Sequence, residues 1–124
     1  MSTIKETEKK SIKPSEKTRF DKVLELAIGE IGDWKYKDNI EKIYLYGSCA
    51  RNEARYESDV DLYIELNEDV PAADIRELKI KCNPEDWRLP DVDIKTGVGA
   101  KIIENDDLFY RNIREDGILL WKRK

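Results

Sequence analysis

The sequence predicts an α/β (α+β) fold, in which a small mixed β-sheet carries helices on one face. Three observations support this prediction. Apolar residues between positions 20 and 31 recur at intervals of three and four, the spacing of one helical stripe. Residues 59–66 and 91–95 alternate apolar and polar side chains, as half-buried strands do. Helical and strand segments then follow each other along the chain, an order typical of helices layered on a sheet.

The first half of the chain begins with a polar segment. Residues 1–15 are rich in lysine and glutamate, and we expect them to form a mobile tail before a single domain at 16–124. Ser15, followed by acidic residues, is the expected start of the first helix. Residues 42–47, KIYLYG, predict a strand that ends at Gly47.

Residues 59–66, DVDLYIEL, predict the second strand, with its apolar residues toward the core and its acids on the opposite face. The remaining elements are expected to be a helix beginning at Pro71, a loop at 83–90, a strand at 91–95 that Gly97 and Gly99 interrupt, a helix from Asn105 to Gly117 and a strand at 118–121.

Composition excludes several classes of function. The 124 residues are 40% apolar and 40% charged, which suits one domain with a charged surface, and no apolar run is long enough to span a membrane. The net charge of −4 argues against nucleic acid as the main partner. With no histidine, two cysteines and no secretory signal, the chain is expected in the cytoplasm, without a zinc site or histidine-based catalysis.

Two acids lie where strands seldom place them. Because side chains alternate along a strand, Asp59 and Asp61 share one face, with their Cα atoms roughly 6.5–7 Å apart. Like charges at this spacing repel each other unless a cation lies between them or one acid is protonated. The hard, oxygen-seeking Mg²⁺ fits such a site, with substrate phosphates and water completing its coordination.

Gly47 and Ser48 follow the preceding strand and supply a complementary feature. Glycine lets a triphosphate approach the backbone closely, and the Ser48 hydroxyl with nearby N–H groups can hold anionic oxygens. A third carboxylate would complete a two-metal site, and Asp93 is the candidate, with Asp91 as the alternative. Arg51 is compatible with a contact to the triphosphate and with a solvated helix face.

The spacing of these residues resembles a known signature. Gly47-Ser48, ten further residues and Asp59-x-Asp61 are similar to the motif of the nucleotidyltransferase superfamily that includes DNA polymerase β. The run GSCARNEARYESDVDL resembles the minimal nucleotidyltransferases, small prokaryotic proteins often encoded beside HEPN-domain toxins. The resemblance implies a polymerase β palm-like fold.

The resemblance also implies a reaction and a role for each matching residue. A nucleoside triphosphate and two Mg²⁺ ions would take part, with Asp59, Asp61 and Asp93 as metal-binding and catalytic residues. Gly47, Ser48 and Arg51 would contact the nucleotide phosphates. The family pattern implies transfer of AMP from ATP to a protein hydroxyl, with the chain acting as the antitoxin of a HEPN toxin in a hetero- or homo-oligomer.

Other interpretations remain open from the sequence. The family usually has glycine where this chain has Asn52, which leaves room for a binding module that neutralises its partner by contact with weak or lost catalysis. Modification of a small molecule is a third possibility, although aminoglycoside nucleotidyltransferases carry a further helical domain. The sequence does not specify the nucleotide or the acceptor hydroxyl.

Overall fold

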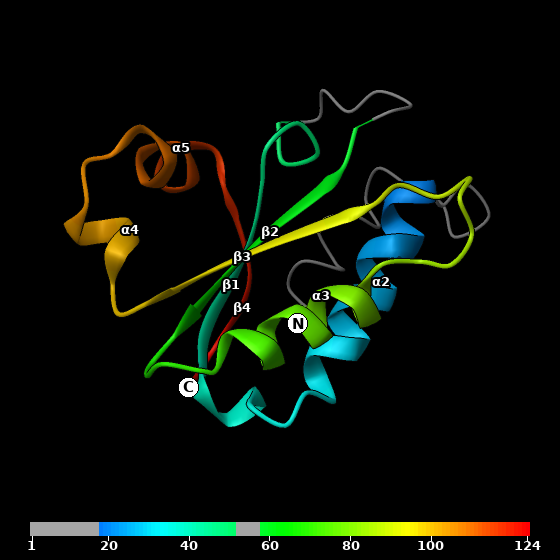
Figure 1. The fold of residues 1–124 in the computed structure, drawn as a ribbon. Coiled ribbons are helices and arrows are strands. Elements are labelled where there is room, and N and C mark those ends of the chain that lie inside the picture. The colour runs from blue at the N-terminus through cyan, green and yellow to red at the C-terminus, as the bar shows by residue number, and fades with distance from the viewer. Residues whose placement is uncertain (1–17, 52–57) are drawn as a thin grey trace.

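A computed structural model describes residues 18–51 and 58–124, so the predicted tail at 1–15 and Asn52 lie outside the described residues. Four strands form one sheet, and helices pack on it (Figure 1). In chain order the elements are α2 (Arg19–Gly32), the short 3₁₀-helix η2 (Lys37–Asn39), β1 (Ile40–Tyr46), β2 (Val60–Leu66), α3 (Ala72–Cys82), β3 (Val92–Val98), α4 (Lys101–Glu104), α5 (Leu108–Asp116) and β4 (Ile118–Lys122). The mixed α/β class is therefore confirmed.

Helix α2 begins later than the sequence suggested. Thr18, and not Ser15, is its N-cap, because Thr18 and Asp21 form a capping box. The Asp21 backbone N–H donates to Thr18 Oγ1 at 3.1 Å, and the Thr18 N–H donates to Asp21 Oδ2 at 3.2 Å. The predicted apolar stripe is confirmed, since Val23, Ala27 and Ile31 are buried.

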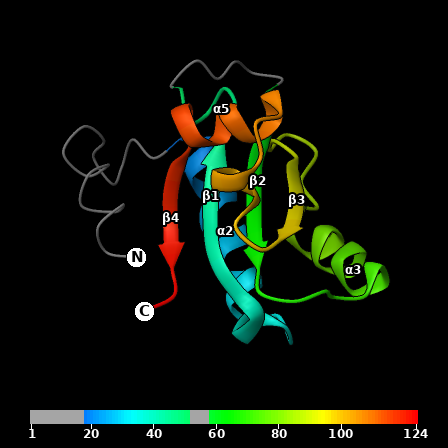
Figure 2. The ribbon, with the colours of Figure 1, turned by 90° about the vertical axis from the view of Figure 1, so that its left-hand side faces the viewer.

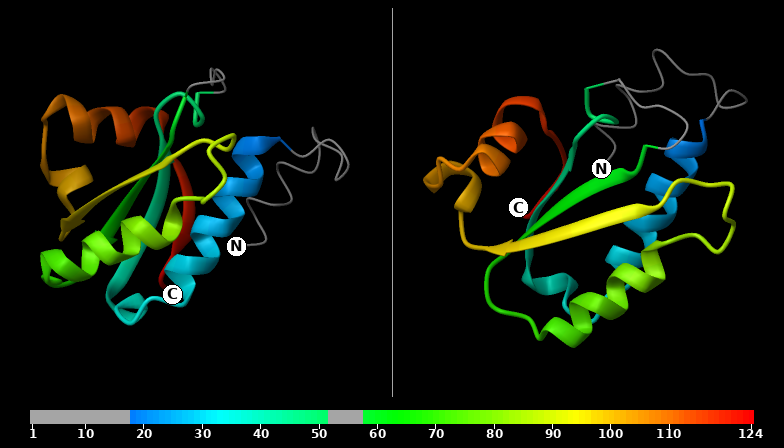
Figure 3. Two further views of the ribbon diagram at one scale, coloured as in Figure 1. Left: turned by 45° about the vertical axis from the view of Figure 1, so that its right-hand side comes forward. Right: turned by 45° about the horizontal axis from the view of Figure 1, so that its top comes forward.

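The strands lie in the order β3-β2-β1-β4, with β1 antiparallel to both β2 and β4, and β2 parallel to β3. Figure 3 shows β2 and β3 running side by side. Their parallel pairing brings both strand beginnings to one edge of the sheet, where β1 ends. The long-range pairing thus gathers the residues around Gly47, Asp61 and Asp93 at the same edge.

Helices cover both faces of the sheet and not only one, which corrects the sequence expectation. Helices α2 and α3 pack on the face that carries Val60, Leu62 and Ile64, and they enclose the main core. Figure 2 shows α4 and α5 on the opposite face. They enclose a smaller cluster of buried residues, Tyr63, Ile102 and Ile113. Local periodicity does not predict this cluster, because α4 has only four residues.

Strand β3 continues through Gly97 to Val98, contrary to the expected break. Gly97 has ordinary strand geometry, and its missing side chain leaves room for the Tyr63 hydroxyl, which a Cβ at position 97 would overlap. Gly99 does end the strand, with a φ of +82°. Among the helices of the described residues, none is long and apolar enough to cross a membrane.

Replacing Tyr63 with phenylalanine should leave the free energy of unfolding unchanged or raise it by about 1 kcal/mol. The Tyr63 hydroxyl is fully buried. The Tyr110 side chain lies beside it, but no group in the described part of the chain forms a hydrogen bond with this hydroxyl. Phenylalanine lacks this hydroxyl, so folding of the variant no longer requires the desolvation of an unsatisfied polar group. Urea unfolding measures the change, and a loss above about 1 kcal/mol would reveal a hydrogen bond to this hydroxyl.

Candidate active site

The structure places the predicted acids at the edge of the sheet where β2 and β3 begin. Asp61 lies between two cross-strand neighbours, Tyr46 of β1 and Asp93 of β3. Directly opposed residues of paired strands share a face, so the Asp61 and Asp93 carboxylates lie side by side. Asp59 and Asp91 immediately precede β2 and β3, and the Val60 N–H donates to the Asp91 carbonyl at 2.9 Å.

Mutual repulsion and burial act on these acids. The pKa of Asp61 is raised to about 6, first by burial and then by the charges of Asp93 and Asp59. The pKa of Asp59 is also raised, by burial and by Asp91 and Asp93. Negative charge is therefore concentrated at this edge, which is the electrostatic condition for binding a cation.

Two basic side chains offset part of this negative charge. Lys95, two residues after Asp93 on the same face of β3, places its Nζ 3.2 Å from Asp93 Oδ2. Arg51, in the turn that follows β1, lies close enough to lower the pKa of Asp61, as Lys95 also does. Sequence periodicity alone places Lys95 on the face of Asp93, and the structure adds the ion pair.

Gly47 and Ser48 begin a turn that packs directly on the Asp61 side chain. Gly47 has a φ of +77°, a backbone region that glycine adopts without strain, and a Cβ at this position would overlap the Asp61 carboxylate. The Arg51 N–H donates to the Gly47 carbonyl at 3.2 Å. Residues 48–51 lie in this turn.

Cys49 connects this turn to the backbone of Asp59. Its thiol donates to the Asp59 carbonyl with a sulfur-to-oxygen distance of 3.5 Å. Burial, together with the charges of Asp61 and Asp21, raises the pKa of the Cys49 thiol to about 11. Because the thiolate is the nucleophilic form, Cys49 has a structural role in this turn.

Aromatic side chains also lie beside Asp61. Tyr46, beside Asp61, packs edge-on against Phe109 of α5 with ring centroids 5.5 Å apart. Burial and the charges of Asp61 and Asp93 raise the pKa of Tyr46, which keeps its phenol neutral. Tyr63 is completely buried, whereas Tyr46 and Tyr44 are partly exposed.

The donor set fits a hard divalent cation. Mg²⁺ binds proteins through one or two carboxylates and takes its other ligands from water and substrate phosphates. Asp61 and Asp93 supply such a pair, with Asp59 close to both. Within residues 18–51 and 58–124, no three side chains of His, Cys, Asp or Glu already surround a single point. The described residues therefore supply a pair of carboxylates, Asp61 and Asp93, with Asp59 near them.

Ionisation of Asp61 should destabilise the metal-free protein. The pKa of Asp61 in the folded protein, about 6, lies above the usual 3.8. The resulting loss in free energy of unfolding is therefore absent below about pH 4, grows as the pH rises and is complete above about pH 6. Partial exposure limits the cost to about 2 kcal/mol. Thermal unfolding in EDTA should show this loss for the wild type relative to Asp61→Asn, and Mg²⁺ should reverse it. Parallel pH profiles of the two proteins would contradict the assignment.

Comparison with known proteins identifies the fold. A profile of the family described as "Polymerase beta, Nucleotidyltransferase" matches residues 33–124. A search of curated proteins finds no significant match. A Sulfolobus solfataricus protein assigned as a nucleotidyltransferase has a similar structure, with a TM-score of 0.57, 20% identity and 85% of each chain covered.

Two chains from toxin–antitoxin complexes also share the fold. One, from a toxin–antitoxin structure with AMP-PNP, has a TM-score of 0.60 at 19% identity, covering 81% of this chain and 73% of the other. The second comes from a tri-AMPylated HEPN toxin of Shewanella oneidensis in complex with MNT antitoxin. Its TM-score is 0.50 at 18% identity, with 85% of this chain and 71% of that chain covered.

Proposed function

The chain belongs to the polymerase beta nucleotidyltransferase family. On that premise, we propose that it transfers a nucleoside monophosphate from a nucleoside triphosphate to a hydroxyl group. One observation carries the proposal: Asp61 and Asp93 are paired across β2 and β3, and the Gly47 turn packs on Asp61. Carboxylates beside a close-approach glycine turn are what a phosphoryl-transfer site requires.

The proposed reaction assigns a task to each side chain. The Gly47-Ser48 turn and Arg51 hold the triphosphate, so that its α-phosphorus faces the acids. The acceptor oxygen attacks this phosphorus, an O–P bond forms, and the bond to the β-phosphate breaks as pyrophosphate leaves. Asp93 orients the acceptor hydroxyl and receives its proton. Mg²⁺ bound by Asp59, Asp61 and Asp93 would neutralise the phosphate charge.

We further propose that ATP is the donor and a hydroxyl of a partner protein is the acceptor, with a HEPN toxin as that partner and this chain as its antitoxin. The fold shared with the toxin–antitoxin chains supports this choice, since one of those complexes contains an AMPylated HEPN toxin. The minimal-nucleotidyltransferase pattern of the sequence points the same way.

A label-transfer experiment tests the proposal. The protein is incubated with α-³²P-ATP and Mg²⁺, with and without a HEPN-domain protein from the same organism, and labelled protein is detected on denaturing gels. We expect label on the partner, none with γ-labelled ATP, and none with the Asp59→Asn/Asp61→Asn variant. A matched control, Asp69→Asn/Asp116→Asn, removes two exposed acids elsewhere and should behave as the wild type.

The possible outcomes separate the two candidate functions. Label that persists in the Asp59→Asn/Asp61→Asn variant would disprove the assigned site. A tight complex that suppresses the partner without any label, with each of the four common nucleotides, would favour the binding module that neutralises by contact.

A further inference from the structure

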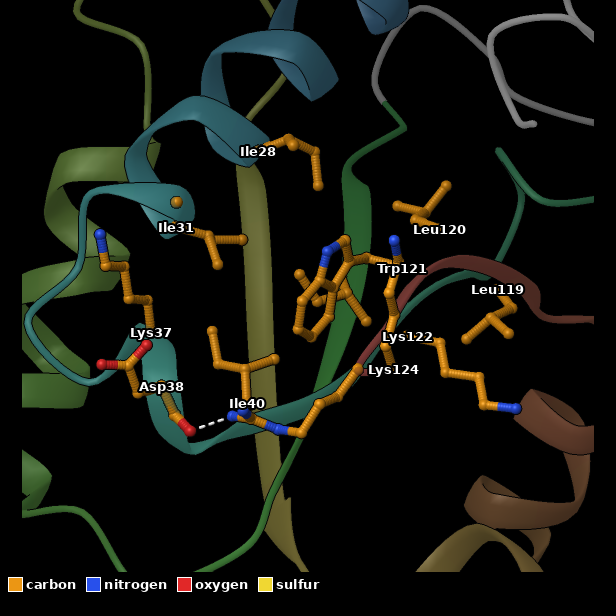
Figure 4. Close-up of a pocket in the computed structure, with 13 residues that line it drawn as sticks. Ile28, Ile31, Lys37, Asp38, Ile40, Leu119, Leu120, Trp121, Lys122 and Lys124 are labelled. Atoms are coloured by element: carbon orange, nitrogen blue, oxygen red, sulfur yellow. Dashed lines mark hydrogen bonds between the residues drawn. The ribbon is translucent and has the colours of Figure 1, made fainter. Parts of the chain in front are cut away.

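The main core face of the sheet is covered unevenly. Helix α2 packs mainly on β2, β3 and α3, while α3 packs on β3 and α2. No helix of the described ranges makes comparable contact with β4 on this face. The half of the sheet formed by β1 and β4 therefore borders an open groove of about 750 Å³ beside the C-terminal part of α2 (Figure 4).

Apolar side chains form two walls of this groove, one on the sheet and one on helix α2. Ile40 and Ile43 of β1 and Trp121 of β4 line the sheet side, and Ile28 and Ile31 of α2 line the helix side. Trp121 points into the space between the two walls in Figure 4. A groove of this size and chemistry accommodates the apolar side of an amphipathic segment.

The rim of the groove is positively charged. Lys37, Lys122 and Lys124 border it, together with one acid, Asp38. All three lysines are exposed, and no acidic group in the described part of the chain forms an ion pair with them. Arg123 is already engaged, because its Nε lies 2.9 Å from Glu41 Oε2 and its Nη2 donates to the Asp38 carbonyl. Although the net charge of the chain is −4, the charged residues that border this apolar surface are therefore mostly basic.

Charge excludes two occupants of the groove. Residues 1–17 contain five lysines and three glutamates, so this segment of the chain would bring further positive charge to a basic rim. A second copy, related by two-fold symmetry, would place two identical basic rims against each other. Strand addition at β4 is also disfavoured, because a bulge interrupts its pairing with β1 between Ile43 and Tyr44.

We propose that this groove is the docking surface for a partner protein, which inserts an amphipathic helix with apolar residues on one side and Asp or Glu beside them. The choice of a partner protein rests on the proposed function. The groove lies toward the beginning of β1, whereas Gly47 follows the end of that strand. Docking here would therefore leave the acids open to nucleotide and to the acceptor hydroxyl.

Labelled synthetic peptides test this proposal. Two short helical peptides share one leucine stripe, which is flanked by glutamates in one and by lysines in the other. Fluorescence anisotropy measures their binding to the full chain in buffer without metal or nucleotide. We expect the glutamate peptide to bind at least about tenfold more tightly, and this advantage to fall as salt rises.

Charge reversal provides the decisive comparison. Lys37→Glu/Lys122→Glu/Lys124→Glu should reverse the preference, so that the lysine peptide binds more tightly. The control Lys22→Glu/Lys79→Glu/Lys101→Glu changes three exposed lysines outside the groove and should keep the wild-type preference. Ile28→Gln should weaken both peptides, with circular dichroism confirming that the variant is folded.

Three results would overturn the proposal: equal binding of the two peptides, no binding of the glutamate peptide, or a preference that charge reversal leaves unchanged. A protein dimer that Ile28→Gln dissociates would also overturn it, since a second copy would then fill the groove. The Asp59→Asn/Asp61→Asn variant should bind the glutamate peptide as the wild type does. Failure of nucleotidyl transfer is therefore distinguishable from failure of docking.

Discussion

Replacing Asp61 with asparagine should lower the rate of nucleotidyl transfer by at least about a thousandfold, because the site loses several kcal/mol of stabilisation of the phosphate charge. The amide keeps the shape of the carboxylate and removes its charge. The carboxylate lies in register with Asp93 and against the Gly47 turn, a position that neither Asp59 nor Asp91 occupies. Single-turnover label transfer under saturating ATP measures the effect.

The same substitution should not unfold the protein, which separates a catalytic role from a structural one. Asp61 is held near other acids, and burial and repulsion raise its pKa to about 6, so its charge destabilises the metal-free fold at neutral pH. Asp61→Asn should therefore unfold at the wild-type temperature or above it in EDTA. A variant that loses activity only because it is unfolded at the assay temperature would contradict this account.

Replacing Gly47 with alanine should produce the second largest loss, at least about a hundredfold in transfer rate, with a loss of stability of about 1–3 kcal/mol. Two physical effects combine at this position. The φ of +77° strains a residue with a Cβ, and that Cβ would overlap the Asp61 carboxylate. The turn must therefore move away from the acids, and the phosphates with it.

Gly99→Ala is the matched control for this prediction. Gly99 also has a positive φ, +82°, but a Cβ there meets no atom within 4 Å. The Gly99→Ala variant should lose about as much free energy of unfolding to backbone strain as Gly47→Ala does, while its transfer rate stays at the wild-type value. Urea unfolding and label transfer, measured on both variants, separate strain from overlap. Equal activity losses in the two variants would mean that the contact between Gly47 and Asp61 has no catalytic importance.

Local patterns predicted much of this fold. The helical stripe at Val23, Ala27 and Ile31 and the alternation in β2 are properties of neighbouring residues, and the structure confirms both. The capping box shows the limit of such reasoning. Ser15 and Thr18 are both plausible caps by residue type, and the Asp21 side chain, which reaches the Thr18 N–H, favours the second.

Long-range contacts account for what the sequence could not predict. Periodicity placed Asp59 and Asp61 on one face, but only the pairing of β2 with β3 puts Asp93 directly beside Asp61 and leaves Asp91 nearer Asp59. Tyr63 alternates like a solvent-facing residue, yet α5 covers it. The continuation of β3 through Gly97 depends in turn on that buried tyrosine. The metal-binding and phosphate-binding roles of the site residues stay predictions.

A crystal structure with Mn²⁺ and a non-hydrolysable ATP analogue would test the central claim most directly, because anomalous scattering locates the metal independently of any assumed chemistry. The account predicts Mn²⁺ coordinated by Asp61 together with Asp59 or Asp93, and the triphosphate against the turn that begins at Gly47 and Ser48. Mn²⁺ bound away from these acids, or a triphosphate at another edge of the sheet, would contradict it.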